Sequence, residues 1–455
     1  MKTPSISFFK EFLNINEINK LAKETGFIVR VRKITGFYFL MSVMLYLGDF
    51  ITLRGLSESS FYDEDITRGA IAHKFTKNSV NFVEKVFYGV LDQKLHLTKI
   101  STKQFEYFKD ILLVDSSNIF LKDSLNKIFP GAGGKKNSSS VKVQLLYSYL
   151  NSKISFIELT NGNIPDQKYI INLLSLVNKK ELFIGDLAYM VFNFLYLLDK
   201  KGAYFLGRHN LSRVLYYKTK RTKKNGIEVE IFKKFDINKH KEELQKNVTE
   251  KFLYIKKKNK YIRVRVTFFK TPESIANKRR RDLKKKAKNN NKSKKANKKR
   301  LSLLDWSIFI TNTSSEQLDY KMIRNIYRIR WNIELIFKNW KSILKINKST
   351  VTKNEYRVKF ELYAKLIFAM IIQKIYQRVS SLLWLKNKEL SLFKMTDLFV
   401  RKRHELQISL LISIDKFAAI MRRITQKAIK TCIKEYQKSR KTTLQIIDLA
   451  IEEYR

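Results

Sequence analysis

The amino-acid sequence predicts an α/β fold, and three changes of pattern along the chain support this prediction. Apolar side chains repeat at helical spacing through residues 1–105, for example at Phe8 and Phe12. Short β-rich runs then alternate with helical segments over residues 106–210, which is the order of elements typical of α/β domains. Residues 351–455 return to helical spacing with basic faces. The chain has 455 residues, which is enough for two to four packed units.

The α/β part begins with a strand that carries a single carboxylate. The run Ile111–Leu121 (ILLVDSSNIFL) is apolar and β-rich on both sides of Asp115. Two more runs follow, joined by a polar turn at Asn151 and Ser152, and together they predict a β-hairpin. The further elements expected here are strands at 141–150, 153–160, 181–186 and 203–208, and helices at 166–177 and 190–200.

A β-rich insertion is expected over residues 211–300. Polar and apolar residues alternate within 228–237 and 252–269, which indicates strands. The segment Lys278–Arg300 (KRRRDLKKKAKNNNKSKKANKKR) is of low complexity and strongly cationic, so we expect part helix and part mobile arm. An apolar strand then returns at 306–311.

The charge of the chain points to a polyanionic partner. Lys and Arg number 91 against 41 Asp and Glu, which gives a formal net charge of +50. Such an excess repels itself unless an anion shares the surface, and nucleic acid is favoured because each neutralised phosphate releases a counterion. The alternative is a compositional bias toward Lys and Asn, which the sequence also shows.

Several other classes of protein are disfavoured. The one cysteine, Cys432, allows neither an internal disulfide nor a Cys-based zinc site. The start, MKTPSISFFKEF, does not have the pattern of a signal peptide. The longest apolar run, 36–48, is too short to cross a bilayer and predicts a buried helix. We therefore expect a cytoplasmic protein with no membrane partner.

One predicted helix, 315–346, presents a polar face with a single carboxylate. At about 100° per residue, Tyr327, Arg330, Glu334 and Lys341 fall within an arc of about 60°. The opposite arc is apolar, and it includes Trp340, which is expected in the core. The alternative is a solvated face with ordinary helix ion pairs, which are common and weak.

Two further carboxylates make that face more significant. Asp115 lies inside one apolar strand and Asp186 ends another, and an unpaired carboxylate in such a place is costly without a partner or a metal. Together with Glu334 they form a set of hard oxygen ligands suited to Mg²⁺ or Mn²⁺. Two such ions can stabilise the entering and leaving oxygens of an in-line phosphoryl displacement.

At this point the sequence resembles a known family. Tyr327-x2-Arg330-x3-Glu334-x6-Lys341 resembles the YREK signature of the insertion-sequence-four family of bacterial transposases at all four positions. These are DDE transposases, whose catalytic domain has a ribonuclease H-like fold. Asp115 in VDSS resembles the first catalytic aspartate of the family, and Asp186 in IGDLAY resembles the second. Ala188 stands where the family pattern has glycine, while Tyr189 keeps the aromatic residue. The resemblance covers residues 105–375.

The resemblance implies a role for each site residue. Asp115, Asp186 and Glu334 would bind two catalytic Mg²⁺ ions, with Mn²⁺ as a substitute. The residues that would hold phosphates beside the scissile bond are Tyr327, Arg330 and Lys341. The tryptophans that could stack on an unpaired base are Trp331 and Trp306, although a core position is an equal alternative for Trp306.

The resemblance also implies a domain organisation. The ribonuclease H-like catalytic domain would comprise 106–210 and 301–350, and the insertion with its basic segment 211–300. Residues 1–105 form the N-terminal helical region, expected to bind DNA, and 351–455 the C-terminal helical region.

The implied function is cut-and-paste transposition. The protein would bind the terminal inverted repeats of an insertion sequence, cleave double-stranded DNA at the transposon ends and join them to target DNA. A homodimer in the synaptic complex and association with the nucleoid are expected. Two alternatives remain open: a domesticated or inactive transposase-derived DNA-binding protein, and a metal-dependent nuclease without joining activity.

Overall fold

The structure is a computed structural model of the 455-residue chain. The residues it describes are 4–11, 14–46, 52–59, 61–62, 66–93, 95, 105–133, 138–222, 227–240, 243–244, 247–289, 301–348, 353–384 and 388–435. Part of the predicted basic arm, 290–300, lies outside these residues.

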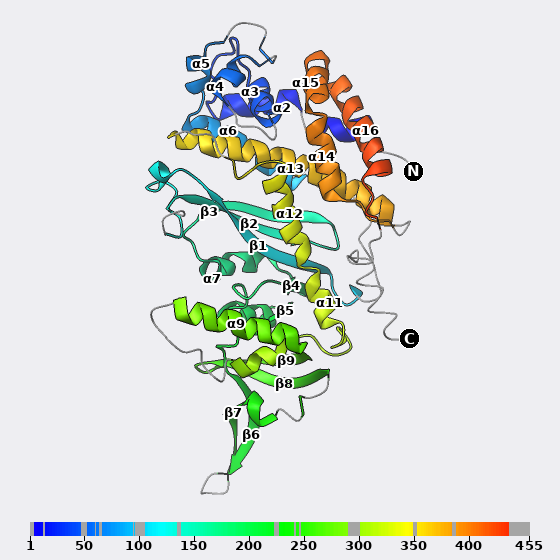
Figure 1. The fold of residues 1–455 in the computed structure, drawn as a ribbon. Coiled ribbons are helices and arrows are strands. Elements are labelled where there is room, and N and C mark those ends of the chain that lie inside the picture. Colours follow the sequence, from blue (N-terminus) through cyan, green and yellow to red (C-terminus); the bar gives the residue numbers. More distant parts are fainter. Residues whose placement is uncertain are drawn as a thin grey trace. The chain divides into compact units, whose positions relative to one another are not determined.

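The chain divides into two compact units (Figure 1). Unit 1 consists of Met1–Ile100, Asp115–Ile164 and Trp331–Gln445. Unit 2 consists of Ser101–Val114, Pro165–Arg330 and Ile446–Arg455. Neither unit is continuous in sequence, because the chain passes from one to the other within strand β1 (Asp110–Phe120) and again after Arg330.

A helical core forms in unit 1, where α13 (Glu355–Trp384) packs against α6 (Lys77–Asp92) and α3 (Gly36–Met44). A capping box between Thr76 and Ser79 fixes the start of α6. Every residue of α3 except Tyr38 is buried, so the short apolar run is the buried helix that the sequence predicts. The other helices of unit 1 in the described residues are α1 (Ile6–Lys10), α2 (Ile15–Glu24), α4 (Leu53–Ser57), α5 (Arg68–Ala72), α12 (Trp331–Ser342), α14 (Leu392–Arg401), α15 (Arg403–Ile412) and α16 (Ile414–Thr431).

The long helix α13 is a core helix by its burial. Within the described residues it is the one helix long and apolar enough to cross a membrane, over Glu355–Leu383, and 72% of its most apolar window is buried. Phe360 on this helix contacts the rings of Phe39 and Phe75 at centroid distances of 5.2 and 5.7 Å. Such packing accounts for its apolar sequence without a membrane.

The strands of unit 1 are the predicted hairpin and the end of β1. Strands β2 (Ser140–Ser148) and β3 (Lys153–Asn161) pair antiparallel, with Val141 opposite Asn161. The turn between them contains Ser152 in the left-handed region, at φ 50°. The strand order in this unit is β3–β2–β1, and α6 and α13 contact β3.

The sheet of unit 2 begins parallel and continues antiparallel. The first part of β1 pairs parallel with β4 (Glu181–Ile184), which pairs parallel with β5 (Tyr204–Arg208). The order then continues β10–β9–β8–β6–β7, so the insertion strands extend the same sheet. These strands are β10 (Trp306–Thr311), β9 (Lys260–Lys270), β8 (Val248–Lys257), β6 (Leu215–Thr222) and β7 (Glu228–Lys234).

The helices of unit 2 follow the predicted order. They are α7 (Asp166–Tyr169) with the 3-10 segment Ile170–Leu176, α8 (Phe192–Lys200), α9 (Glu273–Asn289) and α11 (Ile323–Arg328). Helix α8 contacts β5, β8 and β9. The α/β prediction is confirmed, including a mixed sheet with helical regions before and after it.

The single helix predicted over 315–346 is wrong. The structure has α11 and then α12 (Trp331–Ser342), with a break at Ile329 and Arg330. The backbone amides of Ile329 and Arg330 bond to the carbonyl groups three residues back, at 3.0 and 3.2 Å, instead of four. Such tighter bonds end an α-helical turn. Tyr327 and Glu334 therefore belong to different helices, so the arc calculated for one continuous helix does not apply to them.

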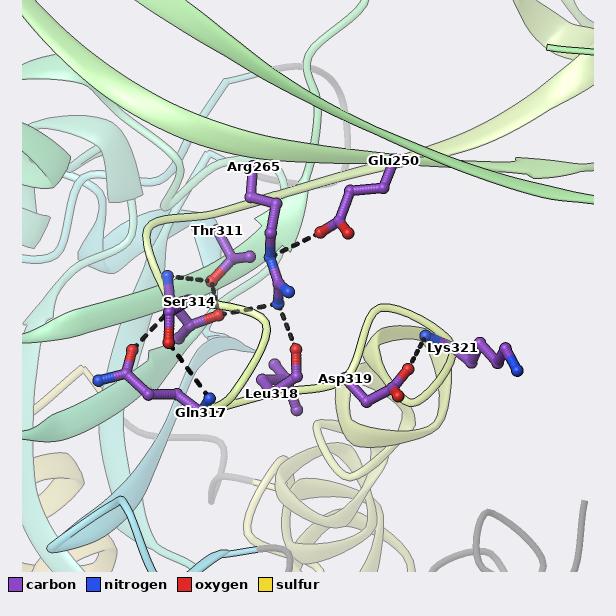
Figure 2. A network of polar contacts seen from close by, with 9 residues as sticks. Glu250, Arg265, Thr311, Ser314, Gln317, Leu318, Asp319 and Lys321 are labelled. Atoms are coloured by element: carbon purple, nitrogen blue, oxygen red, sulfur yellow. Dashed lines mark hydrogen bonds and ion pairs between the residues drawn. The ribbon is translucent and has the colours of Figure 1, made fainter. Parts of the chain in front are cut away.

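A buried arginine organises the loop that leads to α11. Arg265 on β9 is 1% exposed, and its Nε lies 2.9 Å from Oε1 of Glu250 on β8. Its guanidinium also donates to the hydroxyl of Thr313, at 3.2 Å, and to the carbonyl of Leu318 (Figure 2). One side chain thus ties the β8–β9 hairpin to the loop between β10 and α11.

We expect Arg265→Met to destabilise unit 2 strongly. The variant leaves the Glu250 carboxylate, whose side chain is 18% exposed, without its cation. Breaking a buried pair in this way costs about 3–5 kcal/mol of unfolding free energy. The measurement is the denaturant midpoint, and a second variant that combines Arg265→Met with Glu250→Gln should recover part of the loss.

An exposed pair provides the control. Lys220 and Glu228 are 72% and 55% exposed, so Lys220→Met should change the midpoint little. An Arg265→Met midpoint equal to that of the Lys220→Met variant would contradict the structural role of Arg265.

Candidate functional site

Asp115 lies where β1 leaves the core. The four residues before it, Ile111–Val114, are at most 3% exposed, whereas Asp115 and the next three residues are half-buried. Its Oδ1 accepts a hydrogen bond of 2.8 Å from the backbone amide of Ser116. The carboxylate is therefore held by the backbone at the end of a rigid buried segment.

Helix α12 presents Glu334 and Lys341, which are seven residues apart and so lie on one face. Its other face is buried, with Ile333, Ile336 and Trp340 at most 3% exposed. This confirms Trp340 as a core residue. The side-chain amide of Asn339, itself buried, donates to the carbonyl of Leu392 on α14 at 3.3 Å. Packing on one side thus fixes the direction of the polar face.

One cavity of unit 1 gathers the predicted residues of β1 and α12. It has a volume of about 450 Å³ and is lined by Asp115, Ser116, Ser117, Glu334, Phe337, Lys338, Lys341 and Ser342. Burial lowers the pKa of Lys341, and the negative charge of Asp115 acts in the opposite direction. Two carboxylates and two lysines therefore line the same hollow, in which an anionic group with a cation could be held.

Asp186 belongs to unit 2 and follows β4 by two residues. Its Oδ1 accepts a hydrogen bond of 2.8 Å from the amide of Ala188, and its carbonyl accepts one of 3.2 Å from the amide of Tyr189. Gly185 is required here, because a Cβ would lie 2.8 Å from that of Tyr189 and 3.0 Å from Cγ1 of Val114. Ala188 supplies the backbone amide that this turn uses, although the family pattern has glycine at its position.

Tyr327 lies beside two guanidinium groups in unit 2. The carbons at the centre of the Arg208 and Arg330 guanidinium groups lie 5.6 and 5.8 Å from its ring centroid. Burial raises the pKa of Tyr327, the two arginines lower it, and Asp186 raises it. These charges show that Asp186, Tyr327 and Arg330 share one electrostatic environment.

Arg208 is a residue that the sequence reasoning missed. It ends β5 and is exposed. The available signal was a cation at the carboxyl end of a buried strand, the same kind of position that pointed to Asp186.

The two tryptophans differ in exposure. Trp331 is 55% exposed at the start of α12, as a stacking residue must be. Trp306 is 9% exposed, and its indole Nε1 donates to the carbonyl of Leu244 at 3.4 Å. That burial favours the core alternative for Trp306 over a role in stacking.

The carboxylates of the cavity fit a hard divalent cation only in part. Asp115 and Glu334 supply the oxygen ligands that Mg²⁺ prefers. Among the residues described, no three His, Cys, Asp or Glu side chains are gathered into a group that could hold a metal. A complete site therefore needs a ligand beyond this pair.

The chain is similar to known transposases over most of its length. The family described as "Transposase DDE domain" matches residues 106–371. The transposase for insertion sequence element IS1151 of Clostridium perfringens is 30% identical over 456 residues, which cover 97% of this chain and 95% of that protein. The transposase for insertion sequence element IS231F of Bacillus thuringiensis subsp. israelensis is 25% identical and covers 86% of this chain and 84% of that protein.

One solved structure was also matched. A piggyBac transposase synaptic complex with hairpin DNA has a TM-score of 0.45 and 10% identity, over 94% of this chain and 85% of that chain. The mixed sheet of the structure agrees with the ribonuclease H-like fold of DDE catalytic domains. From the family match over residues 106–371 and the similarity to the IS1151 transposase over nearly its whole length, we conclude that the chain belongs to the DDE transposase family.

Proposed function

We propose that the protein excises and inserts its own insertion sequence. It binds the terminal inverted repeats and hydrolyses a phosphodiester at each end. The freed 3′-OH then attacks a phosphodiester of target DNA, which forms the new phosphodiester bond and releases a 3′-OH of the target strand. The observation that carries this proposal is the cavity of unit 1, where Asp115, Glu334 and Lys341 lie together. Carboxylates for a metal and a cation for phosphate are what such chemistry requires.

Asp186 completes the proposed set of metal ligands. The last registered pair of the parallel strands β1 and β4 is Leu113 opposite Ile184. Asp115 and Asp186 each follow their member of that pair by two residues, Asp115 within β1 and Asp186 just after β4. Equal positions in a parallel register support a shared role.

In this proposal Asp115, Asp186 and Glu334 hold two Mg²⁺ ions, which Mn²⁺ can replace. Bound divalent ions supply Lewis acidity for the in-line displacement at phosphorus. The carboxylates orient the reacting groups, and backbone amides hold two of them in place by donating hydrogen bonds to Asp115 and Asp186.

The cations and aromatic residues of the signature position the DNA. Lys341 neutralises a phosphate at the cavity, and the Tyr327 hydroxyl and Arg330 hold phosphates next to the scissile bond. Trp331 is available to stack on an unpaired base because more than half of its side chain is exposed.

The remaining partners follow from the reaction and the charge. Bringing two ends together requires at least two active sites, which supports a homodimer in the synaptic complex. The charge of +50 supports binding to double-stranded DNA and association with the nucleoid. The helices of 1–105 and 351–455 are proposed to recognise the ends and form dimer contacts.

We expect Glu334→Gln to abolish DNA cleavage. The substitution keeps the shape of the side chain but removes a negative oxygen ligand, so cleavage should fall by about 10³-fold or more. Binding to the inverted repeat should change less than about twofold, because the α12 packing is untouched. Both are measured with a labelled transposon end, and Glu316→Gln, at an exposed residue outside the cavity, is the matched control.

The same assay separates the alternatives. Cleavage by Glu334→Gln at the wild-type rate would refute the proposed active site. Wild-type protein that cleaves but never joins pre-cut 3′-OH ends to target DNA would be a nuclease. Wild-type protein that binds ends without cleaving them would be an inactive descendant of a transposase.

We expect Lys341→Ala to weaken end binding in a salt-dependent way. Loss of one phosphate contact should reduce the slope of log affinity against log salt by about one. The control is Lys127→Ala, at an exposed lysine of the same unit that lies outside the cavity and outside the two helical regions proposed to recognise the ends. An unchanged slope together with a lower melting temperature would show that Lys341 acts on folding and not on phosphate.

A further inference from the structure

Four antiparallel strands of unit 2 carry rings and lysines on one face. We call this set the aromatic–lysine face and define it as Tyr216, Lys218, Phe232, Tyr254, Lys256 and Tyr261. The register places Tyr216 opposite Tyr254, Lys218 opposite Phe232, and Lys256 opposite Tyr261. Residues directly opposite one another in a sheet share a face.

The rings of this face contact one another. The Phe232 centroid lies 5.4 Å from that of Tyr254 and 5.1 Å from that of Tyr261. Tyr254 and Tyr261 are 5.9 Å apart. The three rings therefore form one aromatic cluster, to which β7, β8 and β9 each contribute a ring.

Lysines lie among the rings and not only around them. Lys218 Nζ lies 5.0, 5.6 and 5.7 Å from the centroids of Tyr261, Tyr254 and Phe232. Lys256 Nζ lies 5.0 Å from Phe232. Lys218 also forms an ion pair of 2.6 Å with Glu230. Lys256 is therefore the cation of this face that we assign to a phosphate.

On β8 and β9 the opposite face is the buried one. Leu253, Ile255 and Ile262 are at most 3% exposed, and α8 contacts β8 and β9. The aromatic–lysine face is more open: Tyr261 is 44% exposed and Lys256 is exposed, while the other rings are half-buried. The rings of the aromatic–lysine face therefore do not form the core that packs against α8.

We propose that the aromatic–lysine face binds single-stranded DNA, with bases stacked on the rings and phosphates beside the lysines. Rings interleaved with cations match the flat bases and the regular charges of a nucleic-acid strand. Duplex DNA hides the faces of its bases, so only an unpaired strand uses the rings.

The inference that this single strand comes from a cleaved transposon end rests on the proposed function. Cleavage at a transposon end exposes unpaired nucleotides, and the aromatic–lysine face would retain them. The binding itself does not need the metal or the carboxylates, so the two proposals can fail separately.

The test is binding of a fluorescent oligothymidylate of twelve nucleotides to the full chain in EDTA. The variant Tyr261→Ala/Lys256→Ala should lower affinity about tenfold or more, since stacking contributes about 1–3 kcal/mol per base. Affinity for a duplex that carries the inverted repeat should change less than about twofold. Tyr261→Phe should keep oligothymidylate binding, because the ring remains.

The neighbouring residues provide a matched control. Tyr217 and Lys257 each follow a residue of the aromatic–lysine face by one position, so Tyr217→Ala/Lys257→Ala alters the other side of the same strands. This control should retain oligothymidylate binding, and the melting temperature of each variant shows that it folds.

Three outcomes would overturn the proposal. They are unchanged oligothymidylate binding by the double variant, equal losses for oligothymidylate and duplex, and failure of the wild-type chain to bind oligothymidylate. None depends on cleavage. A Glu334→Gln chain that still cleaves would refute the proposed active site and leave the result for the aromatic–lysine face intact.

Discussion

The parallel pairing of β1 with β4 is the constraint on which the candidate site depends. Ile111–Val114 and Leu182–Ile184 are almost completely buried, so neither strand can carry an unpaired carboxylate within these segments. Asp115 and Asp186 each stand just beyond, where the side chains become half-exposed and backbone amides donate to the carboxylates. The burial that makes the strands rigid therefore also decides where acids can be placed.

In unit 2, the buried guanidinium of Arg265 holds the loop between β10 and α11. Burial lowers the pKa of Arg265, and Glu250 with Asp319 raises it, so nearby acids offset part of the cost of burial. Thr313 and Leu318 accept further hydrogen bonds from the same guanidinium. These contacts fix the loop before α11, and hence the point from which Tyr327 is presented. Most other lysines and arginines among the described residues are exposed or half-exposed, where an anionic partner can reach them.

The spacing of apolar residues predicted the structure correctly wherever a single helical or strand period applied. The apolar run around Asp115, the β2–β3 hairpin and the apolar side of α12 were predicted because burial follows directly from residue spacing. Strand β6 was missed because LYYKTKRT has only Leu215 fully buried and so shows little apolar alternation. The break at Ile329 was also missed, since it has no proline or glycine and arises from hydrogen bonds to carbonyl groups three residues back. Arg208 was missed although it ends the buried strand β5, because its place beside Tyr327 depends on the packing of distant segments.

That break changes how the four-residue signature is understood. Tyr327 and Arg330 belong to unit 2, whereas Glu334 and Lys341 belong to unit 1. Helical geometry fixes the pair on α12, because seven residues bring two side chains to one face. It does not fix Tyr327 relative to Glu334, since no common helix joins them. The signature is thus two pairs, each placed by the packing of its own unit: Glu334 and Lys341 by the buried side of α12, and Tyr327 and Arg330 by the sheet and loop before α11. A change in the packing of either unit would displace one pair and leave the internal geometry of the other intact.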